Sequence, residues 1–169
     1  FIKDLTLVFD EWLKGYRALL FKVIKAYAFQ IDDQNDLFQE ICLQVWKSIP
    51  NFRAESAVST WLYRISLNTA IKWSAKEKKH IGRHHEIDHT DHVLISQGEP
   101  KDDRIEWLYS EIRKFDEVDR SLSLLLLEGY SYKKMAKIIG ISESNIGVKI
   151  HRIKERLAKN VRKTSYYGV

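Results

Sequence analysis

The 169-residue chain has few cysteines, glycines and prolines and no long apolar run, and each of these scarcities excludes a class of structure. Its one cysteine, Cys42, cannot form an intrachain disulfide, which indicates a reducing, cytoplasmic setting. Seven glycines and two prolines favour a largely helical fold. No stretch approaches the roughly 20 apolar residues of a membrane span, and the first residues do not resemble a signal peptide. The sequence therefore predicts a helical protein without direct membrane insertion.

Charge is unevenly distributed along the chain. The net charge is +5, and residues 104–169 alone contain 14 Lys or Arg against eight Asp or Glu. A basic excess in one segment suits a surface that faces phosphate groups. A solvated basic face would have the same composition, so charge by itself leaves both interpretations open.

Residues 131–157 predict two helices joined by a tight turn, the second longer and basic. Ser131 and Ser142 are suited to cap the two helices, and Gly140 lies at the break, where a left-handed backbone costs least without a side chain. Ala136 lets the helices approach closely. This arrangement is typical of proteins that place a helix in the major groove of DNA. An ordinary helical hairpin with a solvated face is the alternative.

The second helix of this pair has two different sides. Ile146, Ile150, Ile153 and Leu157 recur at helical spacing and predict an apolar stripe. The other side mixes residue types that read bases and bind phosphates. These residues are Ser144, Asn145, Val148, Lys149 and Arg152.

The rest of the chain predicts an all-α protein of two small helical domains joined by a polar linker. Three N-terminal helices are expected over Leu5–Phe29, Asp36–Ile49 and Val58–Lys78. Asp32 and Asp33 open the second helix, and Pro50 stops it. Residues 79–103 lose helical periodicity and are expected to form the linker. The predicted domains are an N-terminal bundle over residues 1–78 and a helix-turn-helix domain over residues 104–169.

Two blocks of the chain resemble one known family. The block Asp36–Asn68 reads DLFQEICLQVWKSIPNFRAESAVSTWLYRISLN and resembles the second conserved region of bacterial RNA polymerase sigma factors of the sigma-70 family, in its extracytoplasmic-function (ECF) type. Leu122–Leu157 resembles their fourth conserved region. The resemblance implies an alternative sigma factor that directs RNA polymerase to specific promoters and aids strand opening at the −10 element. It also implies control by an anti-sigma factor.

The resemblance implies a polymerase-docking role for the helix over residues 36–49. An acidic and polar stripe on this helix suits a basic coiled coil of the core polymerase. The matching positions are Asp36, Gln39, Glu40, Trp46 and Lys47.

The loop and helix that follow would, by resemblance, handle the −10 element. One unpaired base would enter a pocket in the loop of residues 51–57, and such a base needs aromatic platforms and polar edges. The matching positions are Asn51, Phe52, Arg53, Glu55, Ser56, Tyr63, Arg64, Asn68 and Lys72. For Phe52 and Trp61, simple packing is the competing interpretation. Housekeeping relatives carry two adjacent tryptophans where this chain has Trp61-Leu62, which suggests a narrower promoter repertoire.

The helix after Gly140 would read the −35 element. The candidate residues are Ser142, Glu143, Ser144, Asn145, Lys149 and Arg152. Many relatives have a basic or hydroxyl residue where Gly147 and Val148 stand here, so the chain departs from the family pattern in the middle of this helix.

Two other classes of protein compete with this interpretation. A helix-turn-helix repressor or activator would explain residues 131–157 but not residues 36–68. A metal-dependent enzyme or sensor would use the linker histidines, some of which have the i,i+4 spacing of zinc ligands. The five linker histidines are His80, His84, His85, His89 and His92, with Asp88 and Asp91 nearby; the pairs with i,i+4 spacing are His80/His84 and His85/His89. A solvated linker is preferred, and without a nucleophile–base motif or phosphate-binding loop we expect no metal, no cofactor and no catalysis.

Overall fold

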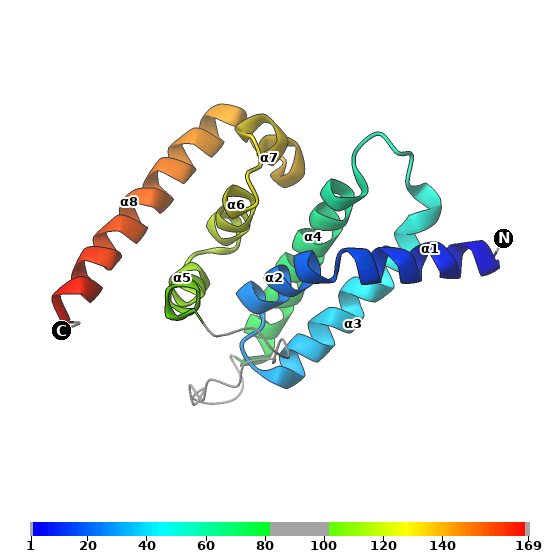
Figure 1. Cartoon of the computed structure of the whole chain (residues 1–169), viewed down its shortest axis with the longest axis horizontal. Coiled ribbons are helices and arrows are strands. Elements are labelled where there is room, and N and C mark those ends of the chain that lie inside the picture. Colours follow the sequence, from blue (N-terminus) through cyan, green and yellow to red (C-terminus); the bar gives the residue numbers. More distant parts are fainter. Residues whose placement is uncertain (1, 82–101, 168–169) are drawn as a thin grey trace. The chain divides into compact units, whose positions relative to one another are not determined.

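The computed structural model describes residues 2–81 and 102–167 (Figure 1). Within these ranges the chain forms α-helices and one short 3-10 helix and contains no strand, which confirms the all-α prediction. The chain divides into two compact units, Phe1–Pro100 and Lys101–Val169. Among the described helices, none combines the length and apolar character that crossing a membrane requires. The predicted domain boundaries at residues 78 and 104 remain predictions, because residues 82–101 lie outside the described ranges.

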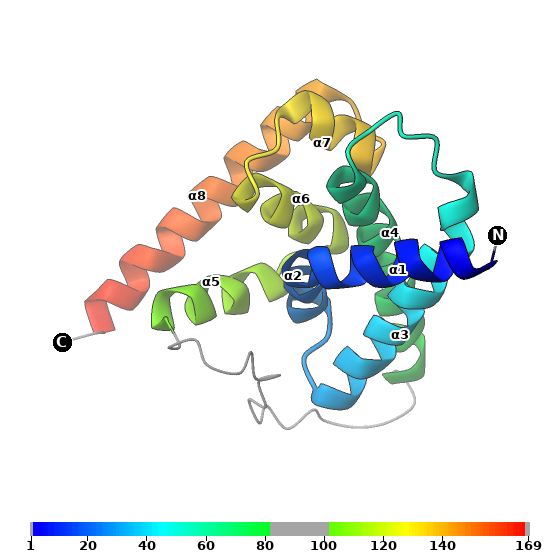
Figure 2. The same cartoon turned by 45° about the vertical axis from the view of Figure 1, so that its right-hand side comes forward.

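The N-terminal unit is a helical bundle in which α3 and α4 lie side by side and α2 packs against both (Figure 2). Its elements are α1 (Ile2–Gly15), α2 (Arg17–Tyr27), α3 (Ile31–Ser48), the 3-10 helix η1 (Ile49–Asn51) and α4 (Val58–Ile81). Leu37, Ile41 and Val45 recur every four residues on α3 and are fully buried. This spacing places them on one face of the helix, so the sequence pattern itself sets which side of α3 joins the core.

The helix predicted over residues 5–29 is wrong in one respect, because this segment forms two helices. The break follows Gly15, and Tyr16 has φ −113° and ψ 19°, outside helical values. Glycine in a helix interior is about 1 kcal/mol less favourable than alanine, so the helix bends there at little cost. The backbone N–H of Tyr16 still donates to the carbonyl of Trp12 at 2.9 Å. This hydrogen bond, together with the one from the Leu20 N–H to the Tyr16 carbonyl at 3.1 Å, keeps α1 and α2 connected across the break.

The other N-terminal helices differ from prediction at their ends. α3 begins at Ile31, before the predicted Asp36. Asp32 and Asp33 lie in its first turn, where the helix dipole stabilises carboxylates. The buried side chain of Gln34 donates from Nε2 to the carbonyl of Ala28 at 3.1 Å and ties the turn before α3 to its first turn. α4 continues to Ile81, three residues beyond the predicted Lys78.

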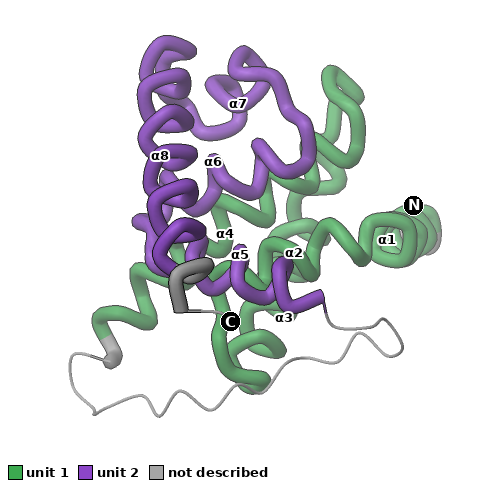
Figure 3. The backbone as a smooth tube through the Cα atoms, turned by 60° about the vertical axis from the view of Figure 1, so that its left-hand side comes forward, with its two compact units in different colours: residues 1–100 green, residues 101–169 purple. Residues whose placement is uncertain are grey.

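The C-terminal unit holds the helix-turn-helix (Figure 3). Its elements are α5 (Asp103–Arg113), α6 (Glu117–Leu127), α7 (Tyr132–Ile139) and α8 (Glu143–Tyr167). The Oγ atoms of Ser131 and Ser142 each accept a backbone N–H at 3.3 Å, and Gly140 adopts φ 83° between α7 and α8. The two predicted caps and the predicted left-handed break are confirmed.

A buried arginine joins α5 to α6 at the base of this unit. Arg120 is 5% exposed, and its Nη2 donates to the carbonyls of Arg113 and Phe115 at 2.8 and 2.9 Å. These carbonyls lie at the C-terminal end of α5, where the helix dipole favours a positive charge. The hydrogen bonds let the guanidinium be buried, and they hold the end of α5 against α6.

Candidate nucleic-acid interface

The first three turns of α8 have one buried and one exposed side. Ile146, Ile150 and Ile153 are at most 2% exposed, which confirms the predicted apolar stripe, and Leu157 is half-buried. Five of the six residues predicted to contact the −35 element are exposed. They are Ser142, Glu143, Ser144, Asn145 and Arg152. The start of α8 thus combines exposed hydroxyl, amide, carboxylate and guanidinium groups on a helix whose other side is fixed in the core.

The sixth predicted residue, Lys149, is held by an ion pair within the protein. Its Nζ lies 2.8 Å from Oδ1 of Asp119 on α6, and the two side chains are 32% and 24% exposed. Asp119 is itself positioned, because its backbone N–H donates to the capping carboxylate of Asp116 at 2.8 Å. Thirty residues separate the partners, so nothing in the sequence pattern pointed to Asp119.

The later turns of α8 are fastened to α5 by polar contacts. Glu111 is 5% exposed and accepts hydrogen bonds from Lys114 Nζ and Asn160 Nδ2, each at 2.6 Å. Burial alone would raise the pKa of Glu111, but these hydrogen bonds outweigh it and hold this pKa below its ordinary value. The guanidinium of Arg156 lies 4.6 Å from the ring centroid of Phe115. α8 is thus anchored from Ile146 to Asn160, which fixes the orientation of its first turns.

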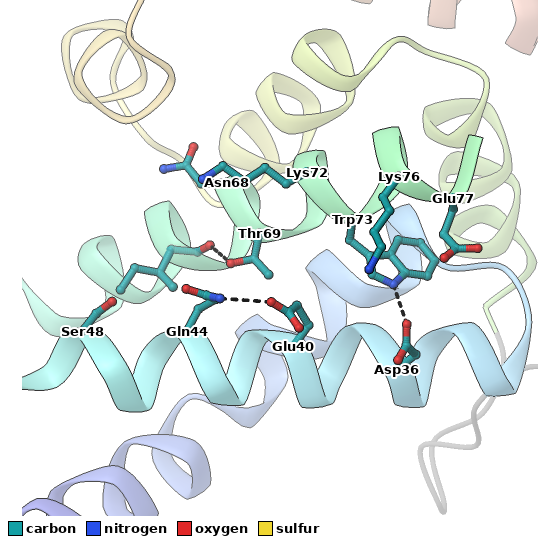
Figure 4. A pocket seen from close by; sticks show the side chains of 11 residues that line it. Asp36, Glu40, Gln44, Ser48, Asn68, Thr69, Lys72, Trp73, Lys76 and Glu77 are labelled. Carbon is teal, nitrogen blue, oxygen red and sulfur yellow. Dashed lines mark hydrogen bonds between the residues drawn. The ribbon is translucent and has the colours of Figure 1, made fainter. Parts of the chain in front are cut away.

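In the N-terminal unit, α3 and α4 form a polar groove (Figure 4). Asp36 and Glu40 line it from α3, and Asn68 and Lys72 line it from α4. The structure therefore brings together residues predicted for polymerase docking and residues predicted for the −10 element. Within the groove, Trp73 Nε1 donates to Asp36 Oδ2 at 2.8 Å and Gln44 Nε2 donates to Glu40 Oε1 at 3.0 Å.

The exposed side of α3 carries the predicted docking residues around an apolar residue that sequence reasoning missed. Leu43 is 44% exposed, and at about 100° per residue it lies between Gln39 and Lys47 on the helix surface. Trp46 is 36% exposed and contacts Phe9 of α1 edge to face, with ring centroids 5.3 Å apart. The spacing could have revealed Leu43, because it falls outside the four-residue stripe that forms the core.

Three aromatic rings pack together where the loop between η1 and α4 begins and where α4 starts. The ring centroids of Trp12, Phe52 and Trp61 are 5.1 to 5.5 Å apart, with edge-to-face geometry. Phe52 and Trp61 are half-buried, so packing, the competing interpretation of these aromatics, describes their observed contacts. Beyond the cluster, Asn51 at the end of η1 and the loop residues Arg53, Glu55 and Ser56 are exposed.

Tyr63 requires a correction. It was predicted to contact the −10 element, but it is 1% exposed and forms part of the core. A side chain enclosed to this degree cannot stack on a base without opening the bundle. Its neighbour Arg64 is exposed, as are Asn68 and Lys72 at the following four-residue steps along α4. These three residues share one face of the helix.

No group of His, Cys, Asp and Glu side chains that could hold a metal occurs within the described residues. Of the linker histidines considered as zinc ligands, His84, His85, His89 and His92 lie outside those residues. His80 is in the last turn of α4, and its side chain is likewise outside the description.

Two family profiles match the chain. Sigma-70 region 2 matches residues 12–80, and Sigma-70, region 4 matches residues 117–157. The first match spans the α3–α4 groove and the exposed loop, and the second spans the helix-turn-helix.

Curated relatives extend the similarity over most of the chain. The RNA polymerase sigma factor YlaC of Bacillus subtilis is 27% identical over 162 residues, which cover 92% of each chain. The RNA polymerase sigma-H factor of Pseudomonas aeruginosa is 28% identical over 163 residues, covering 89% of this chain and 84% of its own. The ECF RNA polymerase sigma-E factor of Haemophilus influenzae is 26% identical over 147 residues, covering 77% and 75%.

Two solved structures share the fold. The sigma factor RpoE of Bartonella quintana, crystallised with the anti-sigma factor NepR, superposes with a TM-score of 0.70 at 20% identity, covering 90% of this chain and 95% of its own. CnrH, solved with the cytosolic domain of CnrY, gives a TM-score of 0.64 at 16% identity, covering 94% and 90%. Taken with the two profiles and the relatives, these matches show that the chain belongs to the sigma-70 family of RNA polymerase sigma factors, in its ECF group.

Proposed function

We propose that this chain is an alternative sigma factor that directs RNA polymerase to specific promoters and aids strand opening at the −10 element. One observation carries the proposal: the two sigma-70 regions occur in a single chain, each within its own compact unit. A chain of this kind can hold the polymerase with one unit and read duplex DNA with the other. A repressor acting without polymerase would not need the first unit.

The start of α8 is proposed to read the −35 element in the major groove. Its exposed groups match known base preferences: an asparagine suits adenine, an arginine suits guanine and a glutamate accepts from cytosine. Asn145, Arg152 and Glu143 supply these groups. Ser142 and Ser144, whose Oγ atoms are 3.3 Å apart, add hydroxyls that can bond bases or phosphates. Lys149 is proposed as a phosphate contact.

The loop before α4 and the exposed face of α4 are proposed to bind the −10 element. Asn51, Arg53, Glu55 and Ser56 are exposed polar groups on a short loop whose base is pinned by aromatic packing. An unpaired base captured there meets polar groups, while half-buried Phe52 supplies an aromatic edge. Arg64, Asn68 and Lys72 continue this surface and suit the backbone just upstream.

The exposed side of α3 is proposed to dock on the core polymerase. It combines carboxylates with apolar groups, through Asp36, Glu40, Leu43 and Trp46. Exposed tryptophan is enriched among the residues that dominate protein interfaces, and the carboxylates suit a basic partner. Gln39 and Lys47 border the same surface.

Regulation and setting complete the proposal. Both solved structures hold a partner protein: the anti-sigma factor NepR with RpoE, and the cytosolic domain of CnrY with CnrH. This supports control of the present chain by an anti-sigma factor. The chain is proposed to act in the cytoplasm, to need no cofactor and to leave RNA synthesis to the polymerase.

The decisive experiment is in vitro transcription by bacterial core polymerase, with and without the full chain, on a promoter library randomised at both elements. We expect transcripts only when the chain is present, and a sequence preference at each element. A variant that carries both Asn145→Ala and Arg152→Ala should lose the sequence preference at the upstream element and still bind core polymerase. A chain that binds DNA but is not retained by core polymerase in a pull-down would be a separate regulator, and the proposal would fail.

A further inference from the structure

Val148 is an apolar residue in the middle of the exposed face of α8. It is 50% exposed, whereas Ile146 and Ile150 are completely buried. Each of these isoleucines is two residues from Val148, which is about 200° around the helix. Val148 therefore points almost directly away from the core of its unit. No packing inside the protein explains a valine here, and β-branched residues are weaker helix formers than the lysine or glutamate typical of such positions.

The neighbours of Val148 are groups that form hydrogen bonds. Ser144, Asn145 and Arg152 lie three or four residues away, on the same side of the helix, and all three are exposed. The ammonium group of Lys149 is paired with Asp119. Among the exposed side chains from Ser142 to Arg152, a stretch that the structure describes completely, Val148 is the one apolar residue.

The adjacent Gly147 is a second sign that this side of α8 faces a partner rather than the protein interior. A Cβ added there would meet only the Cε2 atom of Tyr132, at 3.8 Å, which is an ordinary contact, and Gly147 has no positive φ. Packing and backbone conformation therefore do not require glycine, although it weakens a helix interior. Glycine is suited to positions where a ligand approaches the backbone closely. The surface around Val148 therefore allows a ligand to approach the backbone of α8 closely.

We infer that Val148 determines specificity by contacting the C5-methyl group of one thymine in the upstream promoter element. This inference rests on the proposed reading of duplex DNA by α8. In the major groove the thymine methyl is the apolar group that distinguishes bases, and apolar side chains contact it. A small apolar side chain flanked by hydrogen-bonding groups is matched to a thymine flanked by bases that are read through their polar edges.

The test uses two duplex libraries randomised over both promoter elements, one amplified with dTTP and the other with dUTP. Uracil keeps the pairing of thymine and its O4 acceptor but lacks the C5-methyl group. Holoenzyme assembled from the full chain and bacterial core polymerase selects duplexes from each library, and the selected duplexes are sequenced. We expect one upstream position at which thymine is preferred about three- to fivefold more strongly in the dTTP library, as burial of one methyl group implies.

The Val148→Ala variant should show a clearly smaller difference between the two libraries at that position, because the shorter side chain covers less of the methyl group. Val161→Ala is the matched control: it makes the same change at a 45% exposed residue of α8, about 20 Å further along the helix, and should keep the wild-type pattern. Alanine favours helix, so Val148→Ala should fold, which circular dichroism verifies.

Two results would overturn the inference while leaving the proposed function intact. One is an upstream thymine preference that is equal in both libraries for the wild type. The other is a methyl-dependent preference that is as strong in Val148→Ala as in the wild type. If the holoenzyme selects no upstream sequence from either library, the proposed reading of DNA by α8 fails, and the role of Val148 fails with it.

Discussion

The Nζ atom of Lys149 on the recognition helix α8 lies 2.8 Å from Oδ1 of Asp119 on α6. The pair connects the surface proposed to meet DNA to the helix packed behind it, and Asp116 in turn holds the backbone of Asp119. A lysine bound to a carboxylate is less available to a phosphate group. The structure therefore contains an internal competitor for DNA next to the bases that α8 is proposed to read.

Replacing Asp119 with asparagine should strengthen DNA binding by the holoenzyme. Freed from its partner, Lys149 can reach a phosphate, so we expect a gain of about two- to fivefold at low salt. The slope of log affinity against log salt should steepen by up to about one unit. Binding to the selected promoter is measured over a salt series. The control is Asp119→Asn in a Lys149→Ala background, where the gain should vanish; an equal gain there would mean that Asp119 acts only through its general charge.

Replacing Arg152 with alanine should weaken promoter binding. The expected loss is about 1–3 kcal/mol if the guanidinium contacts a base in a bidentate manner, with relaxed sequence preference at one position, and less if it contacts a phosphate. Arg162→Ala makes the same change ten residues further along α8, where the side chain is also exposed. Affinity is compared at low salt. An unchanged affinity for Arg152→Ala would remove this residue from the interface.

Replacing Gly147 with alanine should separate stability from DNA binding. A Cβ there meets no close atom, with the nearest at 3.8 Å, so the variant should gain about 0.5–1 kcal/mol of stability from helix propensity. Promoter binding should nevertheless weaken, because the added methyl group stands between the helix and the groove. Thermal unfolding and promoter affinity are measured on the same preparation. Unchanged affinity in a stabilised variant would show that DNA does not approach the backbone at this position.

Two substitutions in the N-terminal groove should have different consequences. Trp73→Phe keeps an aromatic side chain but removes the donor to Asp36 and part of the buried ring system, so unfolding of this unit should become easier by at least about 1 kcal/mol. Asp36→Asn keeps an acceptor for Trp73 but removes the charge, so it should spare stability and weaken core polymerase binding. Denaturant unfolding and a polymerase pull-down distinguish the two effects. Loss of polymerase binding in Trp73→Phe alone would instead point to the groove geometry.

Glu111 should make the C-terminal unit sensitive to acid. Its pKa is held below the ordinary value of 4.5, so its ionised form stabilises the fold. This stability is fully present above pH 4.5 and is lost as the pH falls through the lower folded-state pKa of Glu111. Glu111→Gln should cost stability at pH 7 and flatten the dependence below pH 4.5. Denaturant unfolding at several pH values measures both, and parallel curves for the two proteins would contradict the assignment.

Local interactions account for what could be predicted from the sequence. The caps of Ser131 and Ser142 and the left-handed Gly140 involve residues only three or four positions apart, so their chemistry is visible in the sequence. The same holds for the apolar stripe of Ile146, Ile150 and Ile153, which follows the helical period. These features were enough to predict an all-α chain with a helix-turn-helix, and the family resemblance added its partners.

Side-chain placement across the bundle could not be predicted in this way. Tyr63 follows Leu62 in a helix where both neighbouring faces are buried, and only the packing of α2 and α3 shows that its ring is enclosed. Gly15 lies inside an amphipathic pattern that continues on both sides, so periodicity alone did not reveal the break after it. At Tyr63 a plausible local pattern was overridden by contacts with distant residues, whereas the break after Gly15 follows a local signal, the low helix propensity of glycine, which the periodic pattern concealed.

The amino-acid sequence by itself determined the helices of the DNA-reading motif, their caps and the side of α8 that enters the core, because these depend on hydrogen bonds and spacing within a few residues. Only the tertiary structure decided which of the polar residues are free to act. It paired Lys149 with Asp119 in one unit and Trp73 with Asp36 in the other, 30 and 37 residues apart in the chain. The physical reason is that ion pairs and exposure depend on which helices pack together, and this is a property of the assembled unit.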